Sequence, residues 1–317
     1  MAVTEVPLSP SLSTAPTRGQ KIKASLQILF SSKIAVAGLI LVAFWVIVAL
    51  FADNCIVSPA CWAGSKTFEP TPWLARYSPF KQFRGDNLKD PSPTHWLGTD
   101  RNGRDLWARL AHGSRIILTL APISVIVALV FGGTLGVVAG YYGGMVDEFI
   151  MFFLNALMAF PQVLLYLVIV ALAPPELRTF NIVLAITIAG APGIARLVRS
   201  LTLDIKTRDF IAAAQTRGES ALYIMFVEIL PNARGPIIID AMLRVGYAVF
   251  AIGALGFLGL GLPPPSPDWG SIIDSGRRFL LAGHPWDALW ASLAIAMLVV
   301  GLNLMADGIN EETQRYR

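Results

Sequence analysis

Two long windows of the sequence contain no charged residue, and they constrain the fold more than any other feature. Residues 116–140 and 149–173 hold no Asp, Glu, Lys or Arg. Apolar stretches of about 18 or more residues are typical of helices that cross a membrane. In hydrocarbon every backbone polar group must be bonded within the segment, and these continuous apolar runs favour helices over the alternating strands of a barrel. The windows therefore predict an all-α membrane protein.

The composition agrees with this class and excludes others. Hydrophobic residues make up 55% of the 317 residues and charged residues only 15%, whereas soluble domains carry about 25% charged residues. The net charge is +4, and the basic residues lie near the ends of apolar segments rather than in one stripe. This distribution is typical of membrane topology signals and not of a nucleic-acid footprint. We expect membrane lipid around the helices and no nucleic-acid partner.

Six apolar segments are candidates for membrane spans. They cover approximately residues 34–51, 116–140, 149–173, 180–195, 236–260 and 288–306. Pro161 lies inside the third span and is expected to kink or restart that helix. In the second span Gly133, Gly136 and Gly140 lie on roughly one face, which favours close packing against another helix. An even number of spans predicts both chain ends on the same side of the membrane.

Basic residues give the predicted orientation. Lys and Arg residues precede the first span, and the loop 196–235 carries more basic than acidic residues, so both are expected on the cytoplasmic side. The start of the chain lacks the apolar segment of a cleavable signal peptide. The predicted organisation is a cytoplasmic tail (1–33), a first transmembrane helix (34–52), a periplasmic loop (53–115), a five-helix core containing the loop 196–235 (116–306) and a cytoplasmic tail (307–317).

Cysteine and histidine residues do not predict a metal site. Cys55 and Cys61 lie together in the predicted periplasmic loop, where they could form a disulfide or remain two free thiols. Two cysteines without a nearby histidine do not complete a tetrahedral site, and His95, His112 and His284 are scattered. We therefore expect no metal, no other cofactor and no catalytic residue set.

The most informative pattern lies in the predicted cytoplasmic segment 209–232. A first helix over about 203–217 is expected to end at Gly218, because glycine can take a positive φ. Ser220 can cap a second helix, and Pro231 is expected to limit it. The sequence thus predicts two short helices at the membrane surface, joined by a glycine turn.

The first of these helices has a face of small residues. Ala212, Ala213 and Ala214 would leave that face flat enough for the side chains of a partner protein to pack closely. The alternative is a helix that lies on the lipid surface, which physical grounds alone favour.

The spacing in this segment resembles the signature loop of binding-protein-dependent ABC importer permeases. In that signature Glu-Ala-Ala is followed after three residues by Gly and, nine residues later, by Ile, one residue and Leu-Pro. The matching residues are Ala213, Ala214, Gly218, Leu230 and Pro231. Two positions depart from the pattern, since Ala212 replaces the Glu and Glu228 replaces the Ile.

Other motifs narrow the resemblance to the dipeptide, oligopeptide and nickel permeases, and to the second of their two paired subunits. Residues 97–105 read LGTDRNGRD. The residues of this motif that match are Gly98, Thr99, Asp100, Gly103, Arg104 and Asp105. Residues 256–261, Trp269-Gly270 and residues 306–309 are also similar to that subfamily. Locally, the first motif predicts a turn in which Thr99 or Asp100 caps a helix that begins near Asn102.

The resemblance implies a type I ABC importer permease fold with six transmembrane helices in the bacterial inner membrane. It also implies partners: a second permease subunit in a heterodimer, two ATP-binding-cassette ATPase subunits and an extracytoplasmic solute-binding protein. The transported solutes would be peptides or similar small molecules. The sequence has no Gly-x-x-x-x-Gly-Lys-Ser/Thr run, so this chain is not expected to be an enzyme, and the ATPase subunits would hydrolyse ATP.

Two other classes stay open on the residues alone. A secondary transporter or channel driven by an ion gradient usually carries ionisable groups or broken helices at mid-membrane, and a membrane-embedded enzyme needs clustered polar groups. The fifth span carries Asp240 and Arg244, which can pair on one helix face. Because both lie in the first turns of the predicted span, a local structural pair is favoured over a substrate contact.

Overall fold

The computed structural model describes residues 32–53, 72–172 and 174–315, and within these ranges it contains helices and no strand. The α-helices are α2 (Lys33–Phe51), α4 (Leu106–Tyr142), α5 (Gly144–Met158), α6 (Gln162–Ala171), α7 (Arg178–Ile205), α8 (Asp209–Thr216), α9 (Ala221–Tyr223), α10 (Leu230–Phe257), α11 (Trp269–Arg277) and α12 (Trp286–Arg315). A π-helical stretch, Ile224–Ile229, joins α9 to α10. The predicted all-α class is confirmed.

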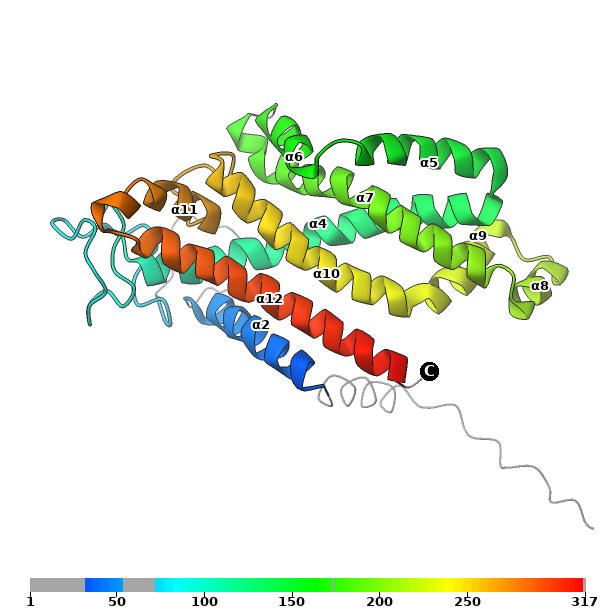
Figure 1. Cartoon of the computed structure of the whole chain (residues 1–317), viewed down its shortest axis with the longest axis horizontal. Helices are drawn as coiled ribbons and strands as arrows, with labels where there is room; N and C mark the ends of the chain where they lie inside the picture. Colours follow the sequence, from blue (N-terminus) through cyan, green and yellow to red (C-terminus); the bar gives the residue numbers. More distant parts are fainter. Residues whose placement is uncertain (1–31, 54–71, 173, 316–317) are drawn as a thin grey trace, which may run out of the picture.

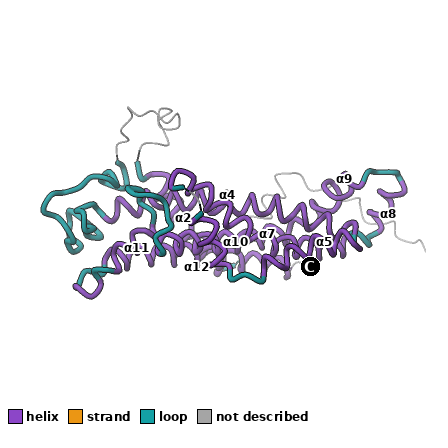
Figure 2. Tube along the Cα trace, turned by 90° about the horizontal axis from the view of Figure 1, so that it is seen from above, coloured by secondary structure: helices purple, strands orange, loops and turns teal. Residues whose placement is uncertain are grey.

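The long helices run side by side along the long axis of the molecule (Figure 1). Within the described ranges, five helical segments are long and apolar enough to cross a membrane, and the bent pair α5–α6 raises the number to six if it counts as one span. Irregular loops gather at one end of the helices, and α8 and α9 lie at the other (Figure 2).

Two spans extend beyond the windows that the sequence predicted. α4 begins at Leu106, where the Asp105 carboxylate caps it by accepting the Ala108 N–H at 2.8 Å. α7 continues through Pro192 to Ile205 instead of ending near that proline. Hydropathy windows stop at charged or helix-breaking residues. Here Arg109 in the first turn of α4 is paired within the protein, and Pro192 is buried in the bundle.

The third span is broken, as Pro161 predicts. The axes of α5 and α6 differ in direction by 87° across a short break. Pro161 precedes the first residue of α6 and cannot continue the hydrogen bonding of α5. Non-helical backbone of this kind is tolerated at membrane depth where protein or a polar cavity covers it.

Close packing between α4 and α7 is built on glycine, with one correction to the predicted face. A Cβ atom added to Gly132 would lie 2.5 Å from the Ala191 carbonyl oxygen, and one on Gly140 would lie 2.7 Å from the Thr202 Cβ. The residues in contact are therefore spaced four apart, with Gly136 between these two. Gly133 faces away, and no described atom lies within 4 Å of its added Cβ.

Two sequence motifs near the end of the chain are further close contacts. Gly308 opposes Ala35, so that α12 packs directly against α2. A Cβ atom on Gly256 would lie 2.7 Å from the Gly270 Cα, so α10 and α11 touch through backbone atoms. Glycine is needed in these motifs because a side chain there would push the two helices apart.

Candidate functional site

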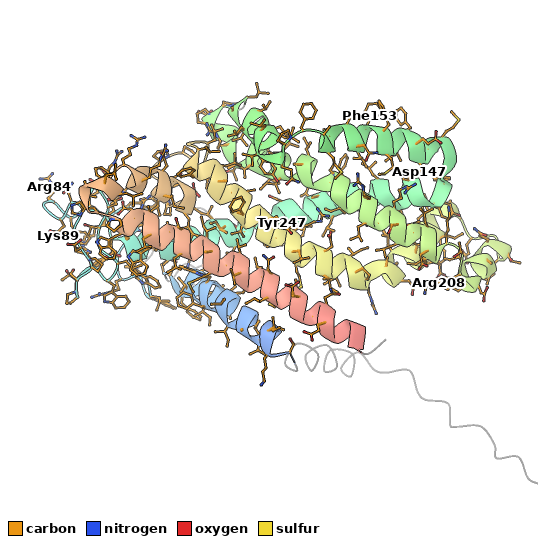
Figure 3. The ribbon with its side chains drawn as sticks, viewed as in Figure 1. Arg84, Lys89, Asp147, Phe153, Arg208 and Tyr247 are labelled. Carbon is orange, nitrogen blue, oxygen red and sulfur yellow. The ribbon has the colours of Figure 1, made fainter. Side chains whose placement is uncertain are left out.

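Charged side chains gather at the two ends of the molecule. Figure 3 shows Arg84 and Lys89 at one end, Arg208 near the other and Tyr247 between them. We call residues 72–105 the collar and residues 209–223 the coupling segment. Most of the predicted motif residues lie in these two regions, and Leu230 and Pro231 follow at the start of α10.

The coupling segment turns at Gly218. This residue has φ +78°, in the left-handed region that favours glycine. Its N–H donates to the Gln215 carbonyl at 2.9 Å, and the Glu219 N–H donates to the Ala214 carbonyl at 3.2 Å. These two bonds form a Schellman motif at the end of α8. The predicted glycine terminus is confirmed, although α8 begins at Asp209 and not near residue 203.

The three alanines of α8 do not share one face. Ala212 and Ala213 are exposed, whereas Ala214 is 0% exposed and packs with Ile211 in a buried cluster. The other cluster members in this part of the chain are Ile224, Met225, Ile229 and Ala233. Ala214 therefore anchors α8 to the helix that follows and cannot touch a partner directly. The sequence alone could not show which alanine turns inward, because that depends on where the next helix lies.

The second helix of the segment does not end at Pro231. The Ser220 hydroxyl accepts the Tyr223 N–H at 3.3 Å, which confirms the predicted cap. From there the helix continues through the π-helical stretch into α10, so that Ala221–Phe257 is one span. Pro231 lies in the first turn of α10, directly after the π-helical stretch, where its missing N–H is tolerated. The coupling segment is thus continuous with a membrane-spanning helix.

Ionic contacts fix the neighbouring helix ends. Arg199 of α7 donates two hydrogen bonds to the Asp147 carboxylate of α5, both at 2.5 Å. The Lys206 ammonium donates to the Gly140 carbonyl of α4 at 2.8 Å. The basic residues that predicted a cytoplasmic loop therefore also join three helices.

Glu228, which departs from the family signature, has a partner of its own. Its carboxylate lies 3.8 Å from the Arg217 guanidinium, which is also 3.7 Å from Glu219. Glu228, at the position where the family signature has Ile, therefore forms an ion pair with Arg217 across the glycine turn.

The collar is tied to α4 by Asp105. Besides capping α4, its carboxylate lies 2.8 Å from the His95 Nδ1. The sequence predicted a cap at Thr99 or Asp100, and this prediction is wrong because Asp100 is used inside the turn itself. Asp100 accepts the N–H groups of Asn102 at 2.8 Å and Arg104 at 2.9 Å.

Asp100 also holds two arginines. The Arg104 Nε donates to its carboxylate at 2.6 Å, and the Arg109 Nε lies 3.8 Å away. Arg109 is 4% exposed, and its Nη2 reaches the Ser266 carbonyl at 3.4 Å. The motif therefore binds the collar to α4 and to the loop before α11.

The remaining motif residues shape the turn. Gly98 and Gly103 have φ +88° and +68°, and added Cβ atoms would collide with backbone oxygens of the collar. The Thr99 hydroxyl accepts the Lys89 N–H at 2.9 Å and donates to the Asp86 carbonyl. The six motif residues are thus brought together in one compact structure.

The loop before α11 closes the same region. The Asp268 carboxylate caps α11 by accepting the Ser271 N–H at 3.1 Å and its hydroxyl at 2.7 Å. Burial raises the pKa of the Asp268 carboxyl, while the hydrogen bonds from Ser271 lower it. Trp269 is fully buried and donates its indole N–H to the Leu110 carbonyl at 2.9 Å.

His95 and His112 have structural partners. The His112 ring lies 2.8 Å from the Ala108 carbonyl and 3.1 Å from the Asp53 carboxylate. Among the described residues, no group of three or more His, Cys, Asp or Glu side chains is placed to hold a metal ion. Cys55 and Cys61 lie outside the described residues, so their disulfide stays a prediction.

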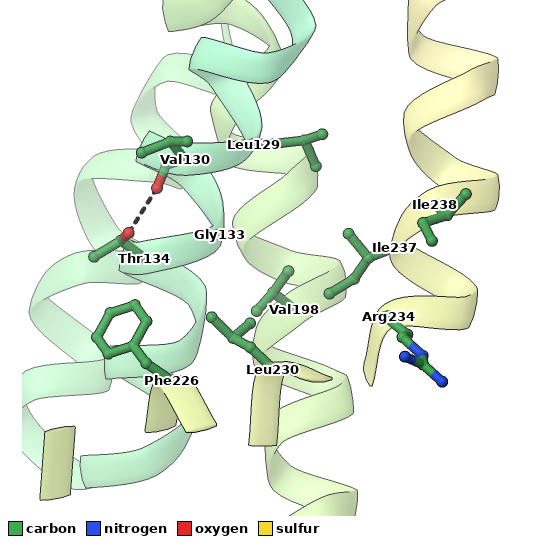
Figure 4. Close-up of a pocket in the computed structure, with 10 residues that line it drawn as sticks. All are labelled: Leu129, Val130, Gly133, Thr134, Val198, Phe226, Leu230, Arg234, Ile237 and Ile238. Carbon is green, nitrogen blue, oxygen red and sulfur yellow. Dashed lines mark hydrogen bonds between the residues drawn. The ribbon is translucent and has the colours of Figure 1, made fainter. Parts of the chain in front are cut away.

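An apolar groove of about 370 Å³ lies between α4, α7 and α10 (Figure 4). Its one hydroxyl, on Thr134, donates to the Val130 carbonyl at 2.6 Å. The Arg234 guanidinium points away from the other lining residues. The groove therefore suits hydrocarbon or another helix better than a charged solute.

Asp240 and Arg244 lie further from the start of their helix than the sequence predicted. They are near the middle of α10, not in the first turns of a span, because the helix begins well before Pro236. The Arg244 Nε donates to the Asp240 carboxylate at 2.5 Å, as the spacing predicts. The predicted position in the first turns of a span is therefore wrong, and the pair lies near the middle of α10.

Within the described ranges, the all-helical bundle with up to six candidate spans and α8 and α9 at one end defines an integral membrane protein. Residues 132–312 match the family described as "Binding-protein-dependent transport system inner membrane component". The chain belongs to this family.

Similar proteins cover most of its length. The dipeptide transport system permease protein DppC of Alkalihalophilus pseudofirmus is 35% identical over 98% of this chain and 94% of its own. DppC of Bacillus subtilis is 31% identical over 95% of this chain and 86% of its own. The glutathione transport system permease protein GsiD of Pectobacterium atrosepticum is 38% identical over 75% of this chain and 79% of its own.

Family membership settles the class. The chain is a permease of an ATP-binding-cassette importer in the bacterial inner membrane, and ATPase and binding-protein partners follow for the family in general. Family membership also excludes the two alternative classes, an ion-driven transporter or channel and a membrane-embedded enzyme.

Proposed function

We propose that this chain is one of two different permease subunits of an importer for peptides or similar small solutes. Two separate ATPase subunits hydrolyse ATP, and an extracytoplasmic binding protein delivers the solute. The names of the relatives, dipeptide and glutathione permeases, support this solute class. The helix continuity at the coupling segment supports the mechanical role.

The coupling segment receives the movement of the ATPase subunits. α8 lies beyond the ends of α4 and α10, where a partner can reach it (Figure 1). Since Ala214 anchors α8 to the start of Ala221–Phe257, a displacement of α8 is passed directly to a transmembrane helix. Such a rigid connection is what alternating access requires.

The docking face is made of small and apolar side chains. Ala213 is exposed on α8, and Leu222, 64% exposed, and Tyr223 lie exposed beyond the turn. Exposed apolar groups rimmed by charged ones are typical of protein interfaces. The same groups could rest on lipid, so an experiment must separate the two surroundings.

The face formed by α5 and α6 is assigned to the second permease subunit. In these two helices only Leu154 and Val170 are buried. Exposed apolar side chains cover the rest of the face, including Phe149, Phe152, Phe153, Phe160, Leu164 and Val168. A broken helix needs protein or a polar path beside it rather than lipid, which favours a subunit interface here.

The proposed orientation places the coupling segment and both chain ends in the cytoplasm, and the collar outside. A reporter enzyme that is active only in the periplasm, fused at Arg317, is expected to be inactive. Activity of this fusion would overturn the even number of spans.

The test of docking is Ala213→Arg. A long charged side chain on the exposed face should hold the ATPase away, so that co-purification of the ATPase and solute uptake fall at normal membrane abundance. Ala282→Arg is the matched control, because Ala282 is exposed at the opposite end beside α11. If Ala213→Arg leaves co-purification and uptake at the level of this control, α8 is not the docking site.

A further inference from the structure

Asp240 and Arg244 form a charged pair inside a transmembrane bundle. The Arg244 guanidinium donates its Nη1 hydrogen to the Gly190 carbonyl at 3.3 Å and lies on the backbone of Gly193, both near the middle of α7. The Arg244 and Asp240 side chains are 21% and 25% exposed, so neither is enclosed by this chain. Ionisable groups within transmembrane helices almost always face the bundle interior or a water-filled cavity, because hydrocarbon does not solvate them.

A cavity opens directly beside Arg244. Its volume is about 210 Å³, far above the ~15 Å³ that one water needs. Its wall contains Arg244, Gln162 at the start of α6 and Met158 at the end of α5. The broken third span thus ends and restarts at the cavity. Helices broken near the membrane centre commonly form solute sites.

Arg244 keeps unused capacity toward this space. A guanidinium carries five N–H donors, and the hydrogen bonds found among the described residues use its Nε toward Asp240 and its Nη1 toward Gly190. An arginine fork matches the geometry of a carboxylate, with two parallel charge-assisted hydrogen bonds. The paired Asp240 supplies the complementary acceptor for an ammonium group.

We propose that Arg244 and Asp240 form a transient recognition site for the free carboxylate of the transported peptide. The solute carboxylate takes the place of Asp240 on the guanidinium, and the released Asp240 faces the peptide ammonium group. Both charges stay paired before and after the exchange, which avoids a buried unpaired ion. This proposal rests on peptides being the solutes, as proposed above.

The position of Arg244 also connects the site to the ATPase. Arg244 lies on the continuous helix Ala221–Phe257, whose first turn is the end of the coupling segment. A displacement of this helix would move Arg244 relative to α6 and α7, whose residues complete the cavity.

The test uses the complete transporter in proteoliposomes, with binding protein and ATP. Initial uptake is compared for dialanine with a free C-terminus and for the same dipeptide with an amidated C-terminus. For Arg244→Gln we expect uptake of the free dipeptide to fall about tenfold or more, with the amidated one changing less than about twofold. Arg244→Lys should retain part of the preference. Because the binding protein is the same throughout, its own selectivity cancels in the comparison with the unmodified transporter.

Arg234→Gln is the matched control, since it removes the same charge from α10 outside this cavity. An unchanged free-to-amide ratio in Arg244→Gln would overturn the proposal. An equal fall in uptake of both dipeptides, together with loss of the second permease on purification, would also overturn it. That result would show that the pair is a contact between subunits. If the single variant is absent from the membrane, the double variant Arg244→Gln, Asp240→Asn is used instead, because it leaves no unpaired charge. The double variant is expected to show the same fall in the ratio of free to amidated dipeptide uptake. An unmodified transporter that imports neither dipeptide would instead refute the proposed solute class.

Discussion

The collar and the coupling segment hold their sequence motifs in place by different kinds of contact. In the collar, buried carboxylates bind arginines and backbone N–H groups, and Asp100 alone contacts three residues of its own turn and α4. The coupling segment relies on a glycine turn and on small apolar residues such as Ala214. The collar is therefore fixed to the helices by charged contacts, whereas apolar packing joins the coupling segment to the start of α10.

The largest expected effect comes from breaking the collar. Asp100→Asn keeps the shape but removes the charge that pairs with Arg104 and the buried Arg109. Leaving such a partner unpaired costs about 3–5 kcal/mol. We expect a large loss of thermal stability in the detergent-purified permease.

Asp274→Asn is the control, because its partners Arg277 and Arg278 are exposed. A surface pair contributes about 0–1 kcal/mol. Equal unfolding temperatures for the two variants would show that the collar charges are not structural.

A smaller loss of stability, but a larger loss of function, is expected at the coupling segment. Gly218→Val forces a β-branched residue into positive φ, at a cost of about 1–2 kcal/mol. No described atom lies within 4 Å of a Cβ atom at this position, so the strain is purely conformational. We expect normal membrane abundance with strongly reduced uptake. Gly218→Asn should retain uptake, since asparagine tolerates this conformation. Equal uptake by both variants would contradict the claim that uptake requires the left-handed turn at Gly218.

Loss of the helix cap should have a milder effect. Ser220→Ala removes the hydroxyl that accepts the Tyr223 N–H, which costs about 1 kcal/mol. Hydrogen exchange of the first amides of α9 should accelerate, with a partial loss of uptake. Thr216→Ala removes a hydroxyl that bonds only the Ala212 carbonyl in its own helix, and should change neither quantity. An exchange rate unaffected by Ser220→Ala would contradict the assigned cap.

The smallest effect is expected at the ion pair across the glycine turn. Arg217 is 56% exposed and 3.7–3.8 Å from its acidic partners. Contacts of this kind contribute less than about 1 kcal/mol and weaken with salt. Arg217→Gln should leave thermal stability nearly unchanged at physiological salt. A loss as large as that of Asp100→Asn would remove the distinction between the two ends.

The sequence predicted the helical spans because hydrocarbon imposes one solution on long apolar windows. It also predicted Gly218 as the end of one helix and Ser220 as the N-cap of the next, since both depend on local backbone chemistry. It did not predict that Ala214 turns inward, because the direction of one residue on a short helix depends on the helix packed beneath it. The continuation through Pro231 was missed because a π-helical stretch has no simple sequence signal.

The position of Asp240 and Arg244 near the middle of their helix was not predicted, for a related reason. Charges and prolines shorten a hydropathy window, so α10 was predicted to start near Pro236 rather than at Leu230. The packing of α10 against α5–α7 then brings Arg244 beside the break between α5 and α6, a contact that no local sequence pattern contains.

The central claim is that the coupling segment touches an ATPase subunit through the exposed face of α8. It is tested most directly by cysteine cross-linking in the assembled transporter, with Cys55 and Cys61 replaced by Ser. Ala213→Cys is expected to form an adduct with the ATPase, and its yield should change when ATP binds. Ala214→Cys, buried on the opposite face, should form little or none. An adduct at Ala214 but not at Ala213, or none at either position in an active transporter, would contradict this account.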